Sequence, residues 1–234
     1  MAQAFEILET AEEARTAWWE RAVSLHKQPP AYQRVLDLAG SALLLMLFAP
    51  LFGVVALLVK VTSAGPILFR QERLGAAGRR FMCLKFRTMH ANVDSAPHRE
   101  YFRRYMEGQA APGEPTNLFK LRNDSRITPV GRVLRRLGLD ELPQLINVTM
   151  GDMSLVGPRP PLEYEVEHYS LRHLRRLSVK PGITGLWQIR GRDVVDFETM
   201  VDMDIEYIEN QSLWLDLIIL FRTVPSLLWA FVRH

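Results

Sequence analysis

Two adjacent carboxylates, Asp140 and Glu141, lie in a stretch of the chain whose residue types suit phosphate chemistry. Gly138 closes the basic segment before them, so we expect Asp140 to be the N-cap of a helix that runs to about Met150. A helix N-terminus carries a partial positive charge, which suits a phosphate group beside a carboxylate. A plain helix cap followed by a solvated Glu141 explains the same residues, so both interpretations stay open at this point.

A Gly-Pro-Arg-Pro sequence at residues 157–160 follows this helix and places Arg159 between two prolines. Proline fixes its own φ angle, so the backbone that carries the guanidinium should be stiff. A stiffly held arginine suits an anionic ligand, although a rigid loop without a ligand has the same sequence.

Further cations belong to elements that must be placed around the carboxylates. Ile67–Gln71 and Phe81–Phe86 flank a Gly-Ala-Ala-Gly turn and predict a β-hairpin. Lys85 and Arg87 then fall on one face of the second strand, either as a solvated edge or as two cations directed at a phosphate.

Helices are predicted from local signals at several places. Thr128 and Pro129 open a helix that ends at Gly138, and it carries Arg135 among other arginines. We also expect helices over residues 95–107, 163–178 and 196–210, the last of which is acidic and contains Asp204; a turn-rich strand over residues 180–185 should precede it.

The charge distribution narrows the partners. The net charge is +3, but residues 60–136 carry sixteen basic and six acidic side chains. Such a block indicates an anionic partner, for example a nucleic acid, a phosphorylated substrate or a membrane surface. Because this block follows an apolar segment directly, a phosphate-bearing lipid or nucleotide is favoured, and we expect no nucleic acid partner.

The sequence lacks the residues or motifs of several well-known kinds of site. The single Cys83 rules out an internal disulfide, and its apolar neighbours predict a packed core residue. The chain has no Gly-x-x-x-x-Gly-Lys loop, no Gly-x-Ser-x-Gly elbow and no His-Glu-x-x-His motif, and its six histidines lack the spacing of zinc ligands.

An uncharged apolar run of membrane length covers residues 38–59. A straight single-pass anchor is one interpretation of this run. However, Pro50 lies near its middle and predicts a bend, and both flanks are basic, which favours the cytoplasmic side for both ends. A re-entrant helix satisfies both observations, and the residues alone leave the two alternatives open.

The two ends of the chain are amphipathic. Residues 4–25 predict an acidic helix, and residues 212–233 predict a helix that lies on a membrane surface or is buried on one side, with a bend near Pro225.

Taken together, these stretches resemble the bacterial sugar transferases, also called monotopic phosphoglycosyl transferases. The matching parts run in the order of that family over residues 31–230. They are the Pro50 helix, Lys85-Phe-Arg-Thr-Met, Leu-Arg-Arg-Leu-Gly-Leu-Asp-Glu-Leu-Pro-Gln, Gly-Asp-Met-Ser-Leu-Val-Gly-Pro-Arg-Pro, Lys-Pro-Gly-Ile-Thr-Gly and residues 205–210. One departure is Ala49, where many relatives have a serine that helps to hold the bend at the proline.

The resemblance implies an enzyme that transfers a sugar-1-phosphate from a UDP-sugar to polyprenol phosphate and releases UMP. Asp140 would be the nucleophile and a ligand of Mg²⁺, with Glu141 as its catalytic support. Such enzymes start the assembly of exopolysaccharide, O-antigen or related glycans. The substrate-binding residues implied in this way are Lys85, Arg135, Arg159, Arg192 and Asp204, and the strand pattern described above adds Arg87 to them.

The expected fold is α+β: a re-entrant membrane helix and a small, mostly helical catalytic domain with a short β-hairpin and interfacial amphipathic helices. We expect an N-terminal extension over residues 1–30, the membrane helix over 31–62 and the catalytic domain over 63–234. The resemblance places this domain on the cytoplasmic face of the bacterial inner membrane, in contact with the lipid bilayer. No motif reads a sugar, and a homo-oligomer is compatible with the sequence. The competing class is a non-catalytic membrane adaptor whose basic face binds lipid phosphates.

Overall fold

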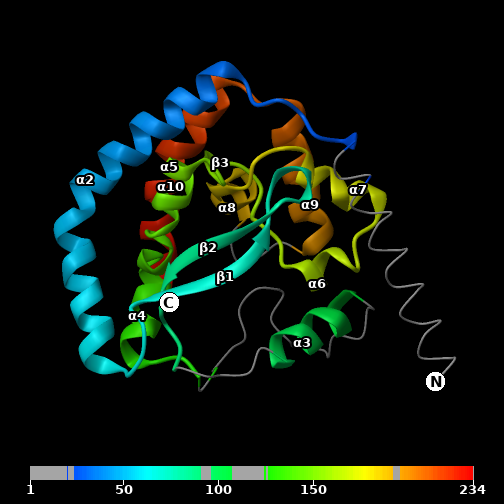
Figure 1. Cartoon of the computed structure of the whole chain (residues 1–234). Helices are drawn as coiled ribbons and strands as arrows, with labels where there is room; N and C mark the ends of the chain where they lie inside the picture. The colour runs from blue at the N-terminus through cyan, green and yellow to red at the C-terminus, as the bar shows by residue number, and fades with distance from the viewer. Residues whose placement is uncertain are drawn as a thin grey trace, which may run out of the picture.

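The computed structural model describes residues 20, 24–90, 96–106, 124, 126–191 and 196–233 (Figure 1). Within them helices and strands are mixed, which confirms the predicted α+β composition, and helices dominate. The acidic helix predicted over residues 4–25 falls almost wholly outside the described part of the chain. The elements, in chain order, are α2 (Ala31–Thr62), β1 (Leu68–Leu74), η1 (Ala76–Gly78), β2 (Arg80–Phe86), α3 (Ala96–Met106), α4 (Pro129–Leu137), η2 (Leu139–Glu141), α5 (Gln144–Met150), β3 (Ser154–Val156), α6 (Glu163–Val166), α7 (Leu171–Leu174), η3 (Arg175–Ser178), β4 (Gly182–Thr184), α8 (Leu186–Gly191), α9 (Phe197–Glu209) and α10 (Leu213–Arg233).

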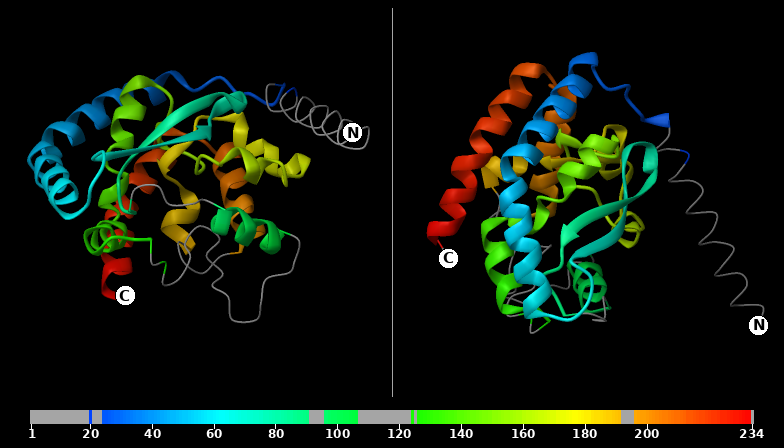
Figure 2. Two further views of the ribbon diagram at one scale, coloured as in Figure 1. Left: turned by 60° about the horizontal axis from the view of Figure 1, so that its bottom comes forward. Right: turned by 60° about the vertical axis from the view of Figure 1, so that its left-hand side comes forward.

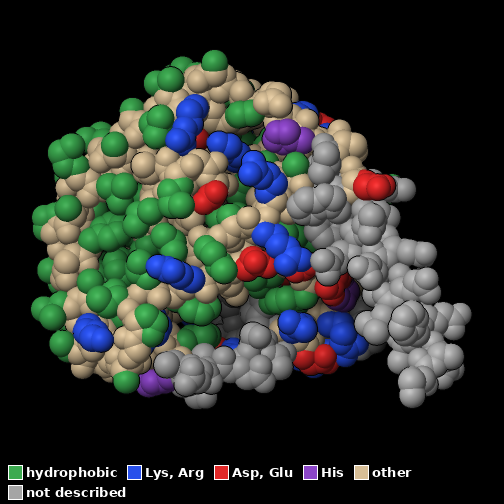
Figure 3. Space-filling model, in the orientation of Figure 1, with side chains coloured by type: hydrophobic (Ala, Val, Ile, Leu, Met, Phe, Trp, Pro, Cys, Tyr) green, Lys and Arg blue, Asp and Glu red, His purple; other side chains and the backbone are tan. Residues whose placement is uncertain are grey.

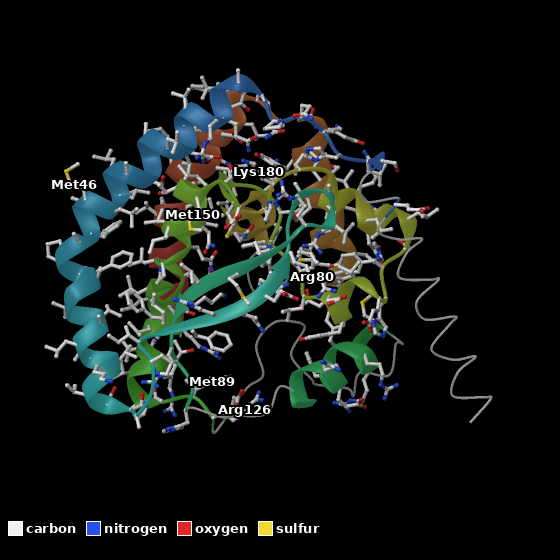
Figure 4. The ribbon with its side chains drawn as sticks, in the orientation of Figure 1. Met46, Arg80, Met89, Arg126, Met150 and Lys180 are labelled. Carbon is white, nitrogen blue, oxygen red and sulfur yellow. The ribbon has the colours of Figure 1, made fainter. Side chains whose placement is uncertain are left out.

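The apolar run forms one long helix, α2, which continues through Pro50 without a break. In Figure 1 it makes an arc whose ends turn toward the domain and whose middle lies farthest from it. The convex side is apolar and exposed, and Figure 4 shows Met46 projecting outward from it. Hydrophobic side chains accordingly gather over this part of the surface (Figure 3). Of all described helices, α2 is the one whose length and composition suit a membrane, and little of it is buried.

The first end of α2 is held by a buried polar cluster. Asp37 is only 1% exposed, and its Oδ1 accepts hydrogen bonds from Ser154 Oγ and from the Leu155 backbone N–H, each at 2.8 Å. Gln33 Nε2 donates to Ser154 Oγ at 3.0 Å. Gln33, Asp37 and Ser41 are spaced four residues apart, so the polar stripe of this apolar helix faces the domain.

The second end of α2 is held by apolar packing and by an arginine. Val55 and Val59 pack with Phe86 of β2 and Leu134 of α4. The guanidinium of Arg87 donates to the backbone oxygens of Ala64 and of Ser63, the latter at 2.8 Å. A cation is favourable at the C-terminus of a helix, where carbonyl groups lack partners. Helix α2 is therefore attached to the domain at both of its ends. These attachments support its curved path, to which Ala49 contributes no side-chain hydroxyl.

The predicted hairpin is present, with β1 and β2 antiparallel and Phe69 paired with Lys85 and Arg73 with Phe81. Directly paired residues share a face of the ribbon, so Arg73 and Lys85 lie on the same face. Helix α5 is fixed to this hairpin by Asn147, whose side chain accepts from the Leu84 N–H at 3.0 Å and donates to the Met82 carbonyl at 2.8 Å.

A second, parallel pair of strands, β3 and β4, was not predicted as a sheet. It requires a very close approach of two backbones, because a Cβ added to Gly157 would lie 2.5 Å from the Lys180 carbonyl oxygen. Glycine at this position therefore brings the turn after β3 next to β4. The predicted helix over 163–178 is wrong in its continuity, because three short segments, α6, α7 and η3, replace it; Ser170 caps α7 and so interrupts the run.

Helix α10 is buried on one side, as one of the two sequence interpretations expected. Its Asp216 accepts a 2.8 Å hydrogen bond from the Tyr207 hydroxyl, and Thr223 pairs with Thr184 at 2.8 Å. Trp214 and Phe221 are exposed on the opposite side. Helices α2 and α10 both lie on the side of the molecule away from α7 (Figures 1 and 2).

The polar contact at the start of α2 leads to a stability prediction. Replacing Asp37 with Ala leaves the buried Leu155 N–H without its acceptor, which should destabilise the protein by about 1–3 kcal/mol. Thermal unfolding in detergent micelles measures this loss. Asp37→Asn keeps an acceptor oxygen and should lose clearly less, so equal losses in the two variants would contradict this account of the contact.

Candidate active site

Asp140 lies in a tight turn between two helices, not at the N-cap of the second one. Gly138 adopts the left-handed conformation (φ 69°) and ends α4. Residues Leu139–Glu141 then form the 3-10 turn η2, and α5 begins only at Gln144 with Pro143 before it. The predicted N-cap role of Asp140 is therefore wrong: the proline, which lacks an N–H, starts the α-helix three residues later. Asp140 belongs to this turn and is buried.

Glu141 pairs with the lysine at the end of the hairpin. Lys85 Nζ lies 2.6 Å from Glu141 Oε1, and both side chains are partly exposed. The pair joins β2 to η2, while Asn147 fixes the following helix to the same strand. The structure thus brings together two residues that the sequence placed in separate motifs.

Arg135 approaches the carboxylates from the last turn of α4. Its Nε donates to Thr88 Oγ1 at 2.8 Å, which orients the guanidinium. Burial lowers the pKa of Arg135, and the charge of Asp140 is the strongest influence in the opposite direction. Asp140 therefore lies within the electrostatic reach of a partly buried cation, an arrangement that suits the binding of an anionic group nearby.

Arg159 is the next predicted residue, and it lies in a cluster of its own beside these groups. Its Nη1 and Nη2 donate to the two carboxylate oxygens of Glu165 at 2.9 and 3.3 Å. Arg73 lies next to this pair, since its pKa is lowered by burial and by Arg159, and Glu165 and Glu141 oppose that change. Glu141 is among the charges that act on Arg73, so this cluster lies within electrostatic reach of the turn that carries Asp140.

Asp204 lies behind the Pro-Arg-Pro turn and pairs with a buried arginine. Its Oδ2 accepts from Arg176 Nε at 2.8 Å, and both side chains are essentially inaccessible. Burial raises the pKa of Asp204 to about 6, although Arg176 lowers it. Arg176 Nη2 in turn donates to the Arg159 backbone oxygen at 3.4 Å. In this structure Asp204 therefore supports the turn through Arg176.

The remaining predicted site residues are placed elsewhere. Arg87 turns to the end of α2, because β2 ends at Phe86 and its guanidinium is bound by the helix carbonyls. Arg192 lies outside the described residues. Cys83 is fully buried, as predicted, and burial raises the pKa of its thiol.

Sequence reasoning missed three charged residues of this region: Arg73, Glu165 and Arg176. The position of Arg73 could have been predicted from the hairpin. Side chains alternate between the two faces of a strand, and Arg73 falls on the same face as Lys85 of the paired strand. For Glu165 and Arg176 the sequence within a predicted helix gave no reason to expect burial.

A magnesium ion would have to be held by few protein ligands. No group of three or more His, Cys, Asp and Glu side chains suited to a metal gathers within the residues that the structure describes. Mg²⁺ is usually bound by one or two carboxylates together with substrate phosphates and waters. The adjacent carboxylates Asp140 and Glu141 fit that mode of binding.

Comparison with known proteins gives a consistent result. The sequence profile of the family described as bacterial sugar transferase matches residues 29–230. The chain is 44% identical over 198 residues to the exopolysaccharide production protein ExoY of Rhizobium meliloti, covering 83% of this chain and 84% of that protein. It is 45% identical over 204 residues to the UDP-glucose:undecaprenyl-phosphate glucose-1-phosphate transferase of Caulobacter vibrioides, covering 84% and 69%. Similarity also extends to the undecaprenyl-phosphate galactose phosphotransferase of Salmonella typhimurium, at 43% over 198 residues, covering 84% of this chain and 40% of that protein.

The buried pair behind the turn leads to a second stability prediction. Asp204→Asn leaves the charge of Arg176 buried without its partner, which should cost about 3–5 kcal/mol of folding free energy. The matched control is Glu209→Gln, which breaks the exposed pair with Arg175, where the side chains are 52% and 37% accessible.

An exposed ion pair contributes about 0–1 kcal/mol, so the control should be close to wild type. Thermal unfolding of both variants, measured side by side, checks the difference. Equal losses in the two variants would show that burial does not decide the contribution of these pairs.

Proposed function

Since this chain belongs to the bacterial sugar transferase family, we propose that it transfers a sugar-1-phosphate from a UDP-sugar to polyprenol (undecaprenyl) phosphate and releases UMP. The names of the Caulobacter and Salmonella relatives support this class of donor and acceptor. The name of the Rhizobium relative supports a role in starting exopolysaccharide assembly.

The observation that carries the proposal is the position of Asp140. It is a buried carboxylate in a tight turn, with Arg135 on one side and the Lys85–Glu141 pair next to it in the chain. Cations placed around a carboxylate stabilise the negative charge of a phosphoryl group that reacts there. A membrane adaptor that binds lipid phosphates would need cations, but no buried carboxylate among them.

In the proposed reaction Asp140 divides the transfer into two displacements. Its carboxylate oxygen attacks the phosphorus that bears the sugar, the bond from this phosphorus to the UMP oxygen breaks, and UMP leaves. A phosphate oxygen of polyprenol phosphate then attacks the same phosphorus, and the bond to Asp140 breaks. The lipid diphosphate-sugar leaves, and the carboxylate is restored. Two steps keep the anionic donor and the anionic acceptor from having to react directly.

The other residues of the site would bind and orient the substrates. Lys85, which pairs with Glu141, would bring a positive charge to the phosphoryl oxygens, and Arg135 would bring a second one. Arg159 would hold the nucleotide through charge-assisted hydrogen bonds. Mg²⁺ bound by Asp140, with Glu141 beside it, would neutralise part of the charge on the diphosphate.

We further propose that α2 enters the membrane from the cytoplasmic face and returns to it. Its exposed convex side, its polar inward stripe and its two ends turned toward the domain support this arrangement. The outward apolar residues of α10 would then lie at the same lipid surface. The catalytic domain would face the cytoplasm at the bacterial inner membrane, where it meets the phosphate of the acceptor lipid.

Asp140→Asn tests the covalent step. The amide is a far poorer nucleophile, so turnover measured as UMP release should fall by at least about three orders of magnitude. The wild type with UDP-sugar and Mg²⁺ but without lipid should release up to one equivalent of UMP and carry a sugar-phosphate adduct on Asp140, detectable by peptide mass spectrometry.

The control is Asp202→Asn, a change of the same kind at an exposed residue that pairs with Arg172. It should keep normal turnover and the same unfolding temperature. Near-normal activity of Asp140→Asn would contradict the covalent mechanism, and an adduct on Glu141 would mean that the roles of the two carboxylates are reversed.

Cysteine labelling tests the topology of α2. Because Cys83 is buried, single cysteines at the exposed positions Gln28 and Ala64 give the signal. With a re-entrant helix, a membrane-impermeant maleimide should miss both sites in intact cells and label both in permeabilised cells. Labelling of one site alone in intact cells would establish a single-pass span.

A further inference from the structure

The backbone of the Pro-Arg-Pro turn is gripped by two buried arginines. Arg73 donates from Nη1 to the Pro160 carbonyl oxygen, and Arg176 donates to the preceding carbonyl, that of Arg159. Both arginines are almost completely buried. The position of the turn is therefore fixed by buried side chains.

A third buried group, Glu165, fixes the side chain of the turn. Its carboxylate is fully inaccessible, it accepts both Arg159 nitrogens, and it also accepts the Leu162 N–H at 3.1 Å. Two parallel bonds to a planar guanidinium set the orientation of that plane as well as its position. A lysine would have no such fork, so the contact is specific to arginine.

The charges of this cluster leave a positive excess at its accessible edge. Burial alone would raise the pKa of Glu165, but Arg159 and Arg73 outweigh it and the pKa is lowered. One carboxylate is thus ionised beside two guanidinium groups. Of these three side chains Arg159 is the most accessible, at 16%, while Glu165 is at 0%. Glu165 orients Arg159 without cancelling the positive charge of the cluster.

We infer that Glu165 is a positioning residue for nucleotide recognition, which presents the Arg159 guanidinium to the diphosphate of the donor. This role rests on the proposed function. Arg73 also helps to position the turn, because it binds the Pro160 carbonyl oxygen. Its guanidinium is the second positive charge that acts on Glu165. An ion pair that only stabilised the fold would have no effect on nucleotide affinity.

A double-mutant cycle of Glu165→Gln and Arg159→Lys tests the role. Each single change should weaken UDP binding, measured by titration calorimetry, by about tenfold, because each removes the charge-assisted fork. The KM for the UDP-sugar should rise by a similar factor, with a smaller change in kcat. Because both changes disturb one interaction, the double variant should bind UDP no more than about twofold worse than Arg159→Lys alone.

The matched control is Glu163→Gln, two residues earlier in α6, where the carboxylate pairs with Arg80 at 2.5 Å. It should leave UDP affinity unchanged. If Glu165→Gln does not fold, Glu165→Asp replaces it in the cycle, since the shorter acid keeps the charge but loses the reach for two bonds.

The positioning role would be overturned if the loss of UDP affinity in the double variant equalled the product of the two single losses. Unchanged UDP affinity in the folded Glu165 variant would also overturn it. Either result would leave the proposed function intact. A wild type that releases no UMP from any UDP-sugar in a broad panel would overturn the proposed function and this role with it.

Discussion

The contact on which much of the structure depends is the hydrogen bond from the Leu155 N–H to the buried carboxylate of Asp37. It joins the long apolar helix to β3, a strand of only three residues. This strand leads through Gly157 directly into the turn that carries Arg159. The same strand pairs with β4, and the hydroxyl oxygen of Tyr207, which donates to Asp216, lies 3.2 Å from its Val156 carbonyl oxygen. Helix α2 and the cationic turn are thus separated by a few residues of backbone, so the position of the helix and the position of the turn are coupled.

The long helices at either end of the described chain have an inverted polarity. In a water-soluble domain the apolar stripe of a surface helix faces the core. In α2 the polar stripe of Gln33, Asp37 and Ser41 is buried, and large apolar side chains are exposed on the other side. In α10 Asp216 and Thr223 bind the domain, and Trp214 and Phe221 are exposed. Polar groups inside and apolar groups outside are typical of a protein surface that contacts lipid, and this pattern is what the proposed membrane location of α2 and α10 rests on.

Local signals predicted the elements of the fold, and long-range contacts escaped them. Helix α4 begins after Thr128, at Pro129, and ends at Gly138, as predicted, because capping signals act within a few residues. The start of α5 was predicted too early, since Pro143 and not Asp140 sets the first helical turn. Arg73 and Glu165 influence each other's pKa although they are 92 positions apart in the sequence, and neither local sequence predicts the other residue.

The site was likewise predictable in its residue types more than in its pairings. The carboxylates and Lys85 could be singled out because their motifs are distinctive, and the structure brings Lys85 and Glu141 into contact. Arg87 could not be separated from Lys85, because alternation along a strand assigns both to one face. The structure separates them at the point where β2 ends and the helix carbonyls attract the guanidinium. Asp204 was selected by resemblance, but its partner Arg176 depends on the packing of α9 against η3.

Two buried ion pairs, Arg159–Glu165 and Arg176–Asp204, lie at a single turn, and their contribution to stability does not explain their presence. Removing two charges from water costs several kcal/mol each, and well-packed apolar residues often replace such a pair without loss of stability. Stability alone therefore gives little reason for Arg159–Glu165 and Arg176–Asp204 to converge on residues 158–160. Orientation gives a better one. The guanidinium groups of Arg73 and Arg176 bind successive carbonyls of the turn, and the Glu165 carboxylate holds the Arg159 guanidinium in a fixed plane. A turn whose purpose is to present one charge at one angle needs that constraint, and apolar packing of the same volume would leave the charge free to rotate.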